Sequence, residues 1–110
     1  SEQEWDRFLS RLQLCSLCLD MAHVVLWGFD PALAARDHAG RIAYAHLHDN
    51  LTRQNTAGDL GDGPMCDYGL FLRTLEEVGF DGWVVAVSGG TRDPLESVKI
   101  NRAYLRSVGY

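Results

Sequence analysis

The sequence lacks a cluster of basic residues and a long apolar run, and these two absences argue against several classes of function. Asp and Glu outnumber Lys and Arg by 15 to 10 in the 110 residues, which gives a formal net charge of −5. Such a field repels phosphate backbones, so no nucleic-acid partner is expected. No apolar stretch reaches the roughly 18 to 20 residues of a membrane span, and the N-terminal segment is too polar for a secretory signal. We therefore expect a cytoplasmic protein with no membrane partner.

Cysteine is scarce and irregularly spaced. The three cysteines, Cys15, Cys18 and Cys66, are an odd number without a disulfide framework, which is typical of a reducing compartment. The Cys15-x-x-Cys18 spacing leaves open a zinc site that Cys66 and one histidine would complete. If this segment is a strand, however, residues three apart face opposite sides and the two thiols diverge. Small buried cysteines are then the simpler interpretation.

The remaining sequence has the composition of one globular domain over residues 1–110, with 46% hydrophobic residues. Apolar spacing and Asp-Pro starts with Gly ends predict helices over 3–13, 30–40, 68–79 and 93–109. Period-2 patterns predict strands over 14–20, 41–49 and 82–87.

This αβαβαβα order predicts an α/β fold in which parallel strands are joined by right-handed crossovers. Three parallel strands have two open edges, whereas a closed barrel of this kind needs about eight βα units. We therefore expect an incomplete barrel or sheet, whose other strands belong to a missing segment or to another copy.

The same periodicities predict which side chains are buried. The expected buried residues are Trp5, Phe8, Leu9 and Leu12 in the first helix, Leu70, Phe71, Leu75 and Val78 in the third, Leu95, Val98, Ala103 and Leu105 in the fourth, and Trp83 and Val85 in the last strand.

Titratable side chains stand at the ends of two predicted strands. Asp20 ends the first strand and His46 lies near the end of the second, on the same side by alternation. Ligands of α/β folds meet the carboxyl ends of strands. Carboxylate and imidazole groups bind Mn, Co, Mg or Zn, and His23, His48 and Asp49 are within reach as further ligands, acids or bases. A structural alternative stays open, in which Asp20 caps a turn and the histidines bond to the backbone.

Two weaker signals have structural alternatives as well. The stretch "GDLGDG" at 58–63 resembles a phosphate loop, but it lacks the Lys-Ser/Thr ending and its aspartates would repel an anion. We therefore interpret it as loop geometry. Trp27 and Tyr44 either stack on a sugar ring or fill a barrel interior.

Several longer stretches resemble a known family. They are "LCLDMAH", "GFDP", "RIAYAHLHD", "GDGPMCDYGLFLRTLEEVGFDGWVVAV" and "RDPLESVKINRAYLRSVGY". Together they look like the C-terminal portion of a xylose isomerase-like TIM barrel, a superfamily that includes sugar-phosphate isomerases, epimerases and inosose dehydratases. The resemblance covers nearly all of the chain but only about three of the eight strands of such a barrel.

In such enzymes an Asp, a His and two Glu bind one divalent metal, which polarises a sugar carbonyl and hydroxyl while carboxylates shuttle a proton. The resemblance implies that Asp20 and His46 are metal ligands. It implies that His23 contacts a sugar or polyol substrate and that Arg53 holds a substrate hydroxyl or phosphate. His23 and His48 are the catalytic candidates, and His48 stands where a Lys is common in relatives, so its charge depends on pH near neutrality.

The sequence departs from the family pattern at two ligands. Val87 occupies the position of the Glu that ends the last strand, and the other Glu lies on an upstream strand that this chain does not contain. Metal binding is therefore expected to be weak and the chain alone inactive. We expect a C-terminal fragment or degenerate relative of a metal-dependent sugar or sugar-phosphate isomerase or epimerase. The alternatives are an inosose dehydratase-like lyase and a non-catalytic half-barrel that forms a homo-oligomer through its open edges.

Overall fold

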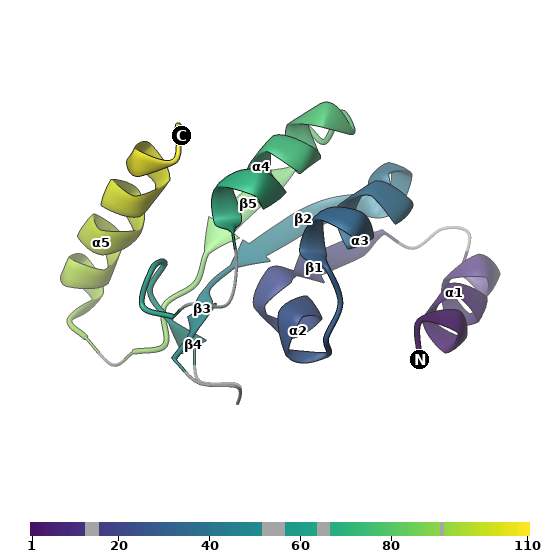
Figure 1. Ribbon diagram of the computed structural model, residues 1–110, viewed down its shortest axis with the longest axis horizontal. Helices are drawn as coiled ribbons and strands as arrows, with labels where there is room; N and C mark the ends of the chain where they lie inside the picture. The colour runs from purple at the N-terminus through teal and green to yellow at the C-terminus, as the bar shows by residue number, and fades with distance from the viewer. Residues whose placement is uncertain (13–15, 52–56, 64–66, 91) are drawn as a thin grey trace.

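The computed structural model describes residues 1–12, 16–51, 57–63, 67–90 and 92–110, without the side chain of Glu2. The helices are α1 (Glu2–Arg11), α2 (Met21–Leu26), α3 (Pro31–Asp37), α4 (Tyr68–Glu77) and α5 (Pro94–Ser107), with a 3-10 turn η1 (Ala39–Arg41) (Figure 1). The strands are β1 (Leu17–Asp20), β2 (Ile42–Leu47), β3 (Asp49–Asn50), β4 (Ala57–Gly58) and β5 (Trp83–Ala86). Within the described ranges, no helix is long and apolar enough to cross a membrane.

The main sheet has three parallel strands in the order β1-β2-β5, as the alternation of helices and strands predicts. Its register places Asp20 beside His46 and His46 beside Val85. The described strands form an open sheet with β1 and β5 at its edges, so they make part of a barrel and not a closed one.

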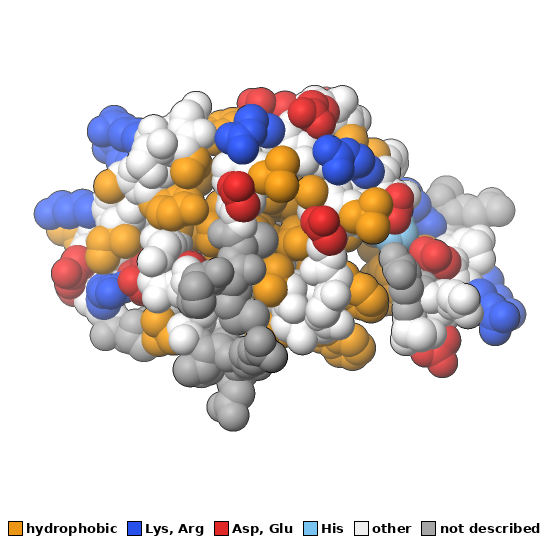
Figure 2. Space-filling model, in the orientation of Figure 1, with side chains coloured by type: hydrophobic (Ala, Val, Ile, Leu, Met, Phe, Trp, Pro, Cys, Tyr) orange, Lys and Arg blue, Asp and Glu red, His pale blue; other side chains and the backbone are white. Residues whose placement is uncertain are grey.

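Helices α3 and α4 cover one face of this sheet (Figure 1). Ala45 and Leu47 point into that layer and are completely buried, and Phe71 and Leu75 of α4 pack in the same core. Small and medium apolar residues on the strand leave room for the helices, which explains this half of the core. The outer surface of the layer carries mixed acidic and basic side chains (Figure 2).

The opposite face of the sheet is exposed, which contradicts the prediction that it is core. Trp83 is 73% exposed, Tyr44 is 40% exposed, and Val85 is only half-buried. The physical reason is that the three described strands do not curve into a closed barrel, which would enclose this face.

The predicted helix starts are confirmed by their caps. Asp30 and Asp93 accept hydrogen bonds from first-turn amides, with proline at the first helical positions of α3 and α5. Gly79 follows α4 with φ +77°, the left-handed conformation of a helix end. Gly40 does not end α3: that helix stops at Asp37 and the chain tightens into η1 before β2.

Besides η1, three short elements were not predicted: α2, β3 and β4. Helix α2 begins directly after β1, and β3 pairs with β4 in an antiparallel ribbon, Asp49 opposite Gly58. Strand β4 ends at Gly58, the first residue of the stretch interpreted as loop geometry. Elements of two to six residues are too short for a periodic signal.

Helix α5 buries a different face from the predicted one. Leu95 and Val98 are 64% and 62% exposed, and Ala103 is exposed, whereas Ser97 and Asn101 are buried. Helix α5 therefore docks through polar side chains as well as through Tyr104 and the predicted Leu105, which are partly buried against the core.

The predicted apolar faces of α1 and α4 are partly wrong. Trp5 and Phe8 are about half exposed and stack on each other, while Leu9 is buried and its carbonyl accepts a hydrogen bond from Arg41. In α4, Leu70 is exposed and the neighbouring position Leu72 is buried instead. Leu12 and Val78 are half-buried. Because α1 meets the rest of the chain near its last turn, its first apolar residues have little to pack against.

Candidate metal centre

Asp20 lies at the junction between β1 and α2. It is the last residue of the strand and the N-cap of the helix, and its Oδ1 accepts a hydrogen bond of 3.2 Å from the His23 backbone N–H. The capping role that the sequence left open is therefore present. The same half-buried carboxylate also contacts histidine side chains, in addition to capping the helix.

Three imidazoles surround this carboxylate. His23 Nδ1 lies 2.9 Å from Asp20 Oδ1, and His48 Nε2 lies 3.4 Å from the same oxygen. His46 Nδ1 lies 3.8 Å from Oδ2. His23 lies in the first turn of α2, His48 directly follows β2, and His46 belongs to β2 itself. The structure thus brings together every histidine that the sequence placed at the strand ends.

His48 differs from its predicted placement. Alternation put it on the strand beside His46, but β2 ends at Leu47, and His48 begins the connection to β3. It is 3% exposed, whereas His46 is half-exposed on the open face of the sheet. Departure from the strand takes the His48 side chain out of the alternating pattern and into the interior.

Asp20, His23 and His48 form the most compact group of ligand atoms in the described part of the chain. One ligand atom of each lies within 4.8 Å of the other two. With metal–ligand bonds of about 2.1 Å, neighbouring ligand atoms in tetrahedral or octahedral centres lie roughly 3.0 to 3.4 Å apart. The two separations from Asp20, 2.9 and 3.4 Å, are close to these values, so each histidine lies where it could share a divalent cation with Asp20.

The orientation of the His48 ring also suits a ligand. Its Nδ1 lies 3.2 Å from the Asp49 carbonyl oxygen, which can only accept, so Nδ1 carries a proton, and Nε2 carries a second one in the charged ring that donates to Asp20. Nε2 is then the atom that faces Asp20. A ligating histidine commonly has this arrangement, in which a carbonyl fixes the tautomer through the other ring nitrogen.

The pKa values of the pair shift in opposite directions. Burial by itself raises the pKa of Asp20, but hydrogen bonds from His48 and His23 outweigh it and hold this pKa well below its ordinary value. The hydrogen bond to Asp20 raises the pKa of His48, although burial opposes this. The Asp20 carboxylate therefore stays ionised, and it can pair either with a protonated His48 or with a bound cation.

A hollow of about 780 Å³ opens beside Asp20 and His23. Trp27, Phe29 and Trp5 line it, and the Trp27 side chain is 74% exposed. Its volume lies within the usual range of small-molecule sites, roughly 300 to 1,000 Å³. Tyr44 is instead on the open sheet face, where its ring meets the His46 ring edge-on.

Val87 follows β5 at the carboxyl end of the sheet. Its backbone N–H donates to the Leu47 carbonyl at 2.8 Å, which continues the parallel ladder and places it next to His48. Because His46 pairs with Val85, Val87 shares a face with Asp20 and His46, and it offers no ligand atom. The other predicted residues, Arg53 and the cysteines Cys15 and Cys66, lie outside the described residues; Cys18 is exposed on β1.

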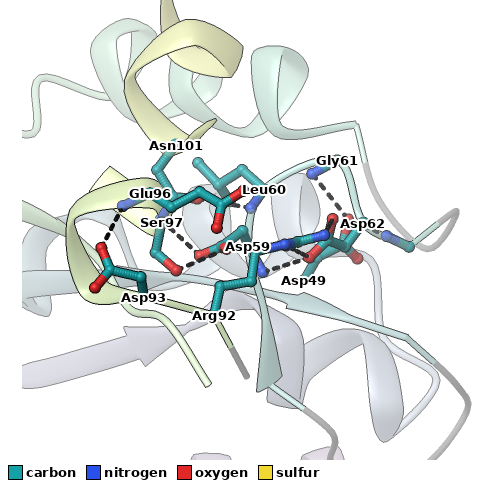
Figure 3. A network of polar contacts seen from close by, with 11 residues as sticks. Asp49, Asp59, Leu60, Gly61, Asp62, Arg92, Asp93, Glu96, Ser97 and Asn101 are labelled. Carbon is teal, nitrogen blue, oxygen red and sulfur yellow. Dashed lines mark hydrogen bonds and ion pairs between the residues drawn. The ribbon is translucent and has the colours of Figure 1, made fainter. Parts of the chain in front are cut away.

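In the "GDLGDG" stretch, two backbone amides are already occupied by a carboxylate of the protein. The amides of Gly61 and Gly63 donate to the Asp49 carboxylate at 3.2 and 2.9 Å (Figure 3). These amides are the groups that would hold a phosphate in a phosphate loop. The interpretation as loop geometry is therefore confirmed.

Sequence reasoning missed the polar network that joins this loop to α5. The buried Asp59 carboxylate accepts from Ser97 at 2.8 Å, Asn101 at 3.1 Å and Arg92 at 3.0 Å, and Asn101 also accepts from the Leu60 amide at 2.7 Å (Figure 3). No local spacing signals such a network, because its members are about 30 to 40 residues apart.

The family model for the xylose isomerase-like TIM barrel matches residues 1–108. The chain belongs to this family. No curated protein matches it in sequence. In TIM barrels the active site lies at the carboxyl ends of the strands, which is where this xylose isomerase-like chain gathers Asp20, His23, His46 and His48.

Proposed function

We propose that the chain provides the C-terminal part of the metal centre of a sugar or sugar-phosphate isomerase or epimerase that depends on a divalent cation. The observation that carries the proposal is the Asp20 carboxylate with histidines around it, at the carboxyl ends of adjacent strands in a xylose isomerase-like chain. A sugar or polyol is the proposed substrate.

Asp20, His23 and His48 would hold the cation, which would polarise a carbonyl or hydroxyl of the sugar. Two imidazoles favour Zn, Co or Mn over Mg, because Mg prefers an all-oxygen set. The half-exposed His46 is then free to exchange a proton with a substrate, and the exposed Trp27 offers its ring face to a sugar. This assignment exchanges the roles that the resemblance gives to His46 and His23, because the geometry groups His23 with His48.

The test is calorimetric titration of manganese or cobalt into the purified chain and five alanine variants. Wild-type protein is expected to bind weakly but saturably, and Asp20→Ala to abolish binding. His23→Ala and His48→Ala should each weaken binding by about tenfold or more, since each removes a ligand worth at least ~1.4 kcal/mol.

His46→Ala and the control His38→Ala should leave the affinity nearly unchanged. His38 is the remaining histidine of the chain and lies 4.0 Å from Asp6 of α1. Loss of binding in His46→Ala, with no change in His23→Ala and His48→Ala, would instead support the ligands implied by the resemblance. Absence of saturable binding in the wild type would refute the metal centre.

A second candidate is supported by the exposed sheet face. Trp83 and Tyr44 present large aromatic surfaces beside two open strand edges. Patches of this kind mark interaction sites, and open edges favour pairing with further strands. We therefore propose that this face mediates homo-oligomer formation.

A further inference from the structure

The carbonyl of His48 lies just beyond the last hydrogen bond of the parallel ladder. That last bond runs from the Val87 amide to the Leu47 carbonyl. The next carbonyl, that of His48, belongs to a buried residue and needs another donor. The hydroxyl of Tyr68 supplies it, at 3.0 Å.

Tyr68 is firmly held. It is the first residue of α4, is 2% exposed, and its ring meets the ring of Tyr104 edge-on, with 5.6 Å between centroids. A buried ring packed in this way cannot turn its hydroxyl towards solvent. The position of the hydroxyl is therefore set by α4 and by its contact with α5.

The residues after His48 are tied to other elements. The Asp49 carboxylate binds the amides of Gly61 and Gly63, and the Asn50 side-chain amide donates to the Ala22 carbonyl of α2 at 3.3 Å. These contacts fix the chain beyond His48. The Tyr68 hydroxyl acts on the His48 backbone itself.

We propose that Tyr68 is a positioning residue for His48: its hydroxyl fixes the backbone from which the imidazole reaches Asp20. This inference rests on the proposed metal centre. Loss of the hydroxyl leaves the buried carbonyl without its donor and lets the backbone shift. Such a shift disturbs both contacts of the ring, Nε2 with Asp20 and Nδ1 with the Asp49 carbonyl.

The test compares Tyr68→Phe with the control Thr74→Val. Thr74 is buried on the same helix and its hydroxyl also donates to a carbonyl, that of Leu70 at 2.8 Å, within α4 and away from the strand end. Each substitution removes one buried hydroxyl and preserves the shape of the side chain, so both chains are expected to fold. Circular dichroism and thermal unfolding check this.

Two readouts are measured for each chain. The first is manganese affinity by calorimetry, which Tyr68→Phe should weaken by roughly tenfold or more and Thr74→Val should leave unchanged. The second is the nitrogen spectrum of the metal-free histidine rings. The His48 ring signals of Thr74→Val should coincide with those of the wild type, whereas those of Tyr68→Phe should shift, because the ring contacts with Asp20 and with the Asp49 carbonyl change.

The two readouts separate the inference from the metal centre. A wild type that fails to bind manganese, together with His48 ring signals that shift in Tyr68→Phe and not in Thr74→Val, refutes the metal centre and supports the positioning role. If the His48 signals of Tyr68→Phe coincide with those of the wild type, the positioning role is wrong, whatever the manganese affinity. The positioning role is also wrong if Thr74→Val changes them equally.

Discussion

At the scale of the residue, Asp20 combines a structural and a chemical task. Its Oδ1 caps α2 and also meets the rings of His23 and His48, so one side chain fixes the helix and the imidazoles relative to each other. Alternation along two strands correctly placed Asp20 beside His46. It could not place His48 or the hydroxyl of Tyr68, because both positions depend on where β2 ends and on contacts with α4.

The Asp20–His48 pair predicts a pH dependence of stability in the metal-free chain. Because the pKa of Asp20 is lowered in the folded chain, its ionised carboxylate stabilises the fold fully at pH values above the unfolded pKa of about 3.9. This stabilisation is lost as the pH falls through the folded pKa. Because the pKa of His48 is raised in the folded chain, its charged ring stabilises the fold fully at pH values below the unfolded pKa of about 6.5. This stabilisation is lost as the pH rises through the folded pKa. The pair thus stabilises most between about pH 4 and 6.5.

Asp20→Asn tests this, because asparagine keeps the size and the capping ability of the residue but removes its charge. The free energy of unfolding, measured with urea at pH 5.5 and pH 8, should differ more between the two pH values in the wild type than in Asp20→Asn. The wild type should gain the additional stability at pH 5.5. Equal differences in the two proteins would show that the pair does not couple to folding.

At the scale of the element, the helix starts were predicted better than the buried faces. The Asp-Pro starts of α3 and α5 and the glycines after α4 and α5 were predictable because caps are local chemistry, whereas Gly40 does not end α3. The buried face of α5 depends on its partner, and that partner is the loop at Asp59, which offers a carboxylate in place of an apolar surface. A helix whose Leu95 and Val98 are exposed while its Asn101 is buried cannot be recognised from apolar spacing.

Asn101→Ala and Leu95→Ala test whether α5 docks through the face that carries Asn101 or through the apolar face that carries Leu95. Asn101→Ala leaves the buried Leu60 amide without its partner and Asp59 with one donor fewer, and should cost about 1 to 3 kcal/mol of unfolding free energy. Leu95→Ala, at an exposed position, should cost less than about 0.5 kcal/mol. Chemical denaturation measures both. A larger loss in Leu95→Ala would mean that the apolar face is the one that docks.

At the scale of the whole molecule, the order of helices and strands was sufficient to predict a parallel sheet, and the family resemblance added that it is part of a barrel. The exposed face was not predicted, because period-2 patterns identify a shared face without showing what covers it. Trp83 illustrates this limit: its place on the face was predictable, whereas its 73% exposure depends on barrel closure.

Self-association through that face is tested with Trp83→Glu. The wild-type chain should have a mass above that of a monomer by light scattering after size exclusion, because apolar aromatic surface is removed from water. Placing a charge in the centre of the face should return the mass to that of a monomer. A monomeric wild type at high protein concentration would contradict the proposed homo-oligomer.

The metal centre itself is tested most directly by X-ray absorption at the cobalt edge of the cobalt-loaded chain. A centre built from Asp20, His23 and His48 predicts scattering from two imidazoles per cobalt, together with oxygen donors, and one imidazole in His48→Ala. A spectrum with oxygen donors alone, identical in the wild type and in His48→Ala, would show that cobalt does not bind at these histidines.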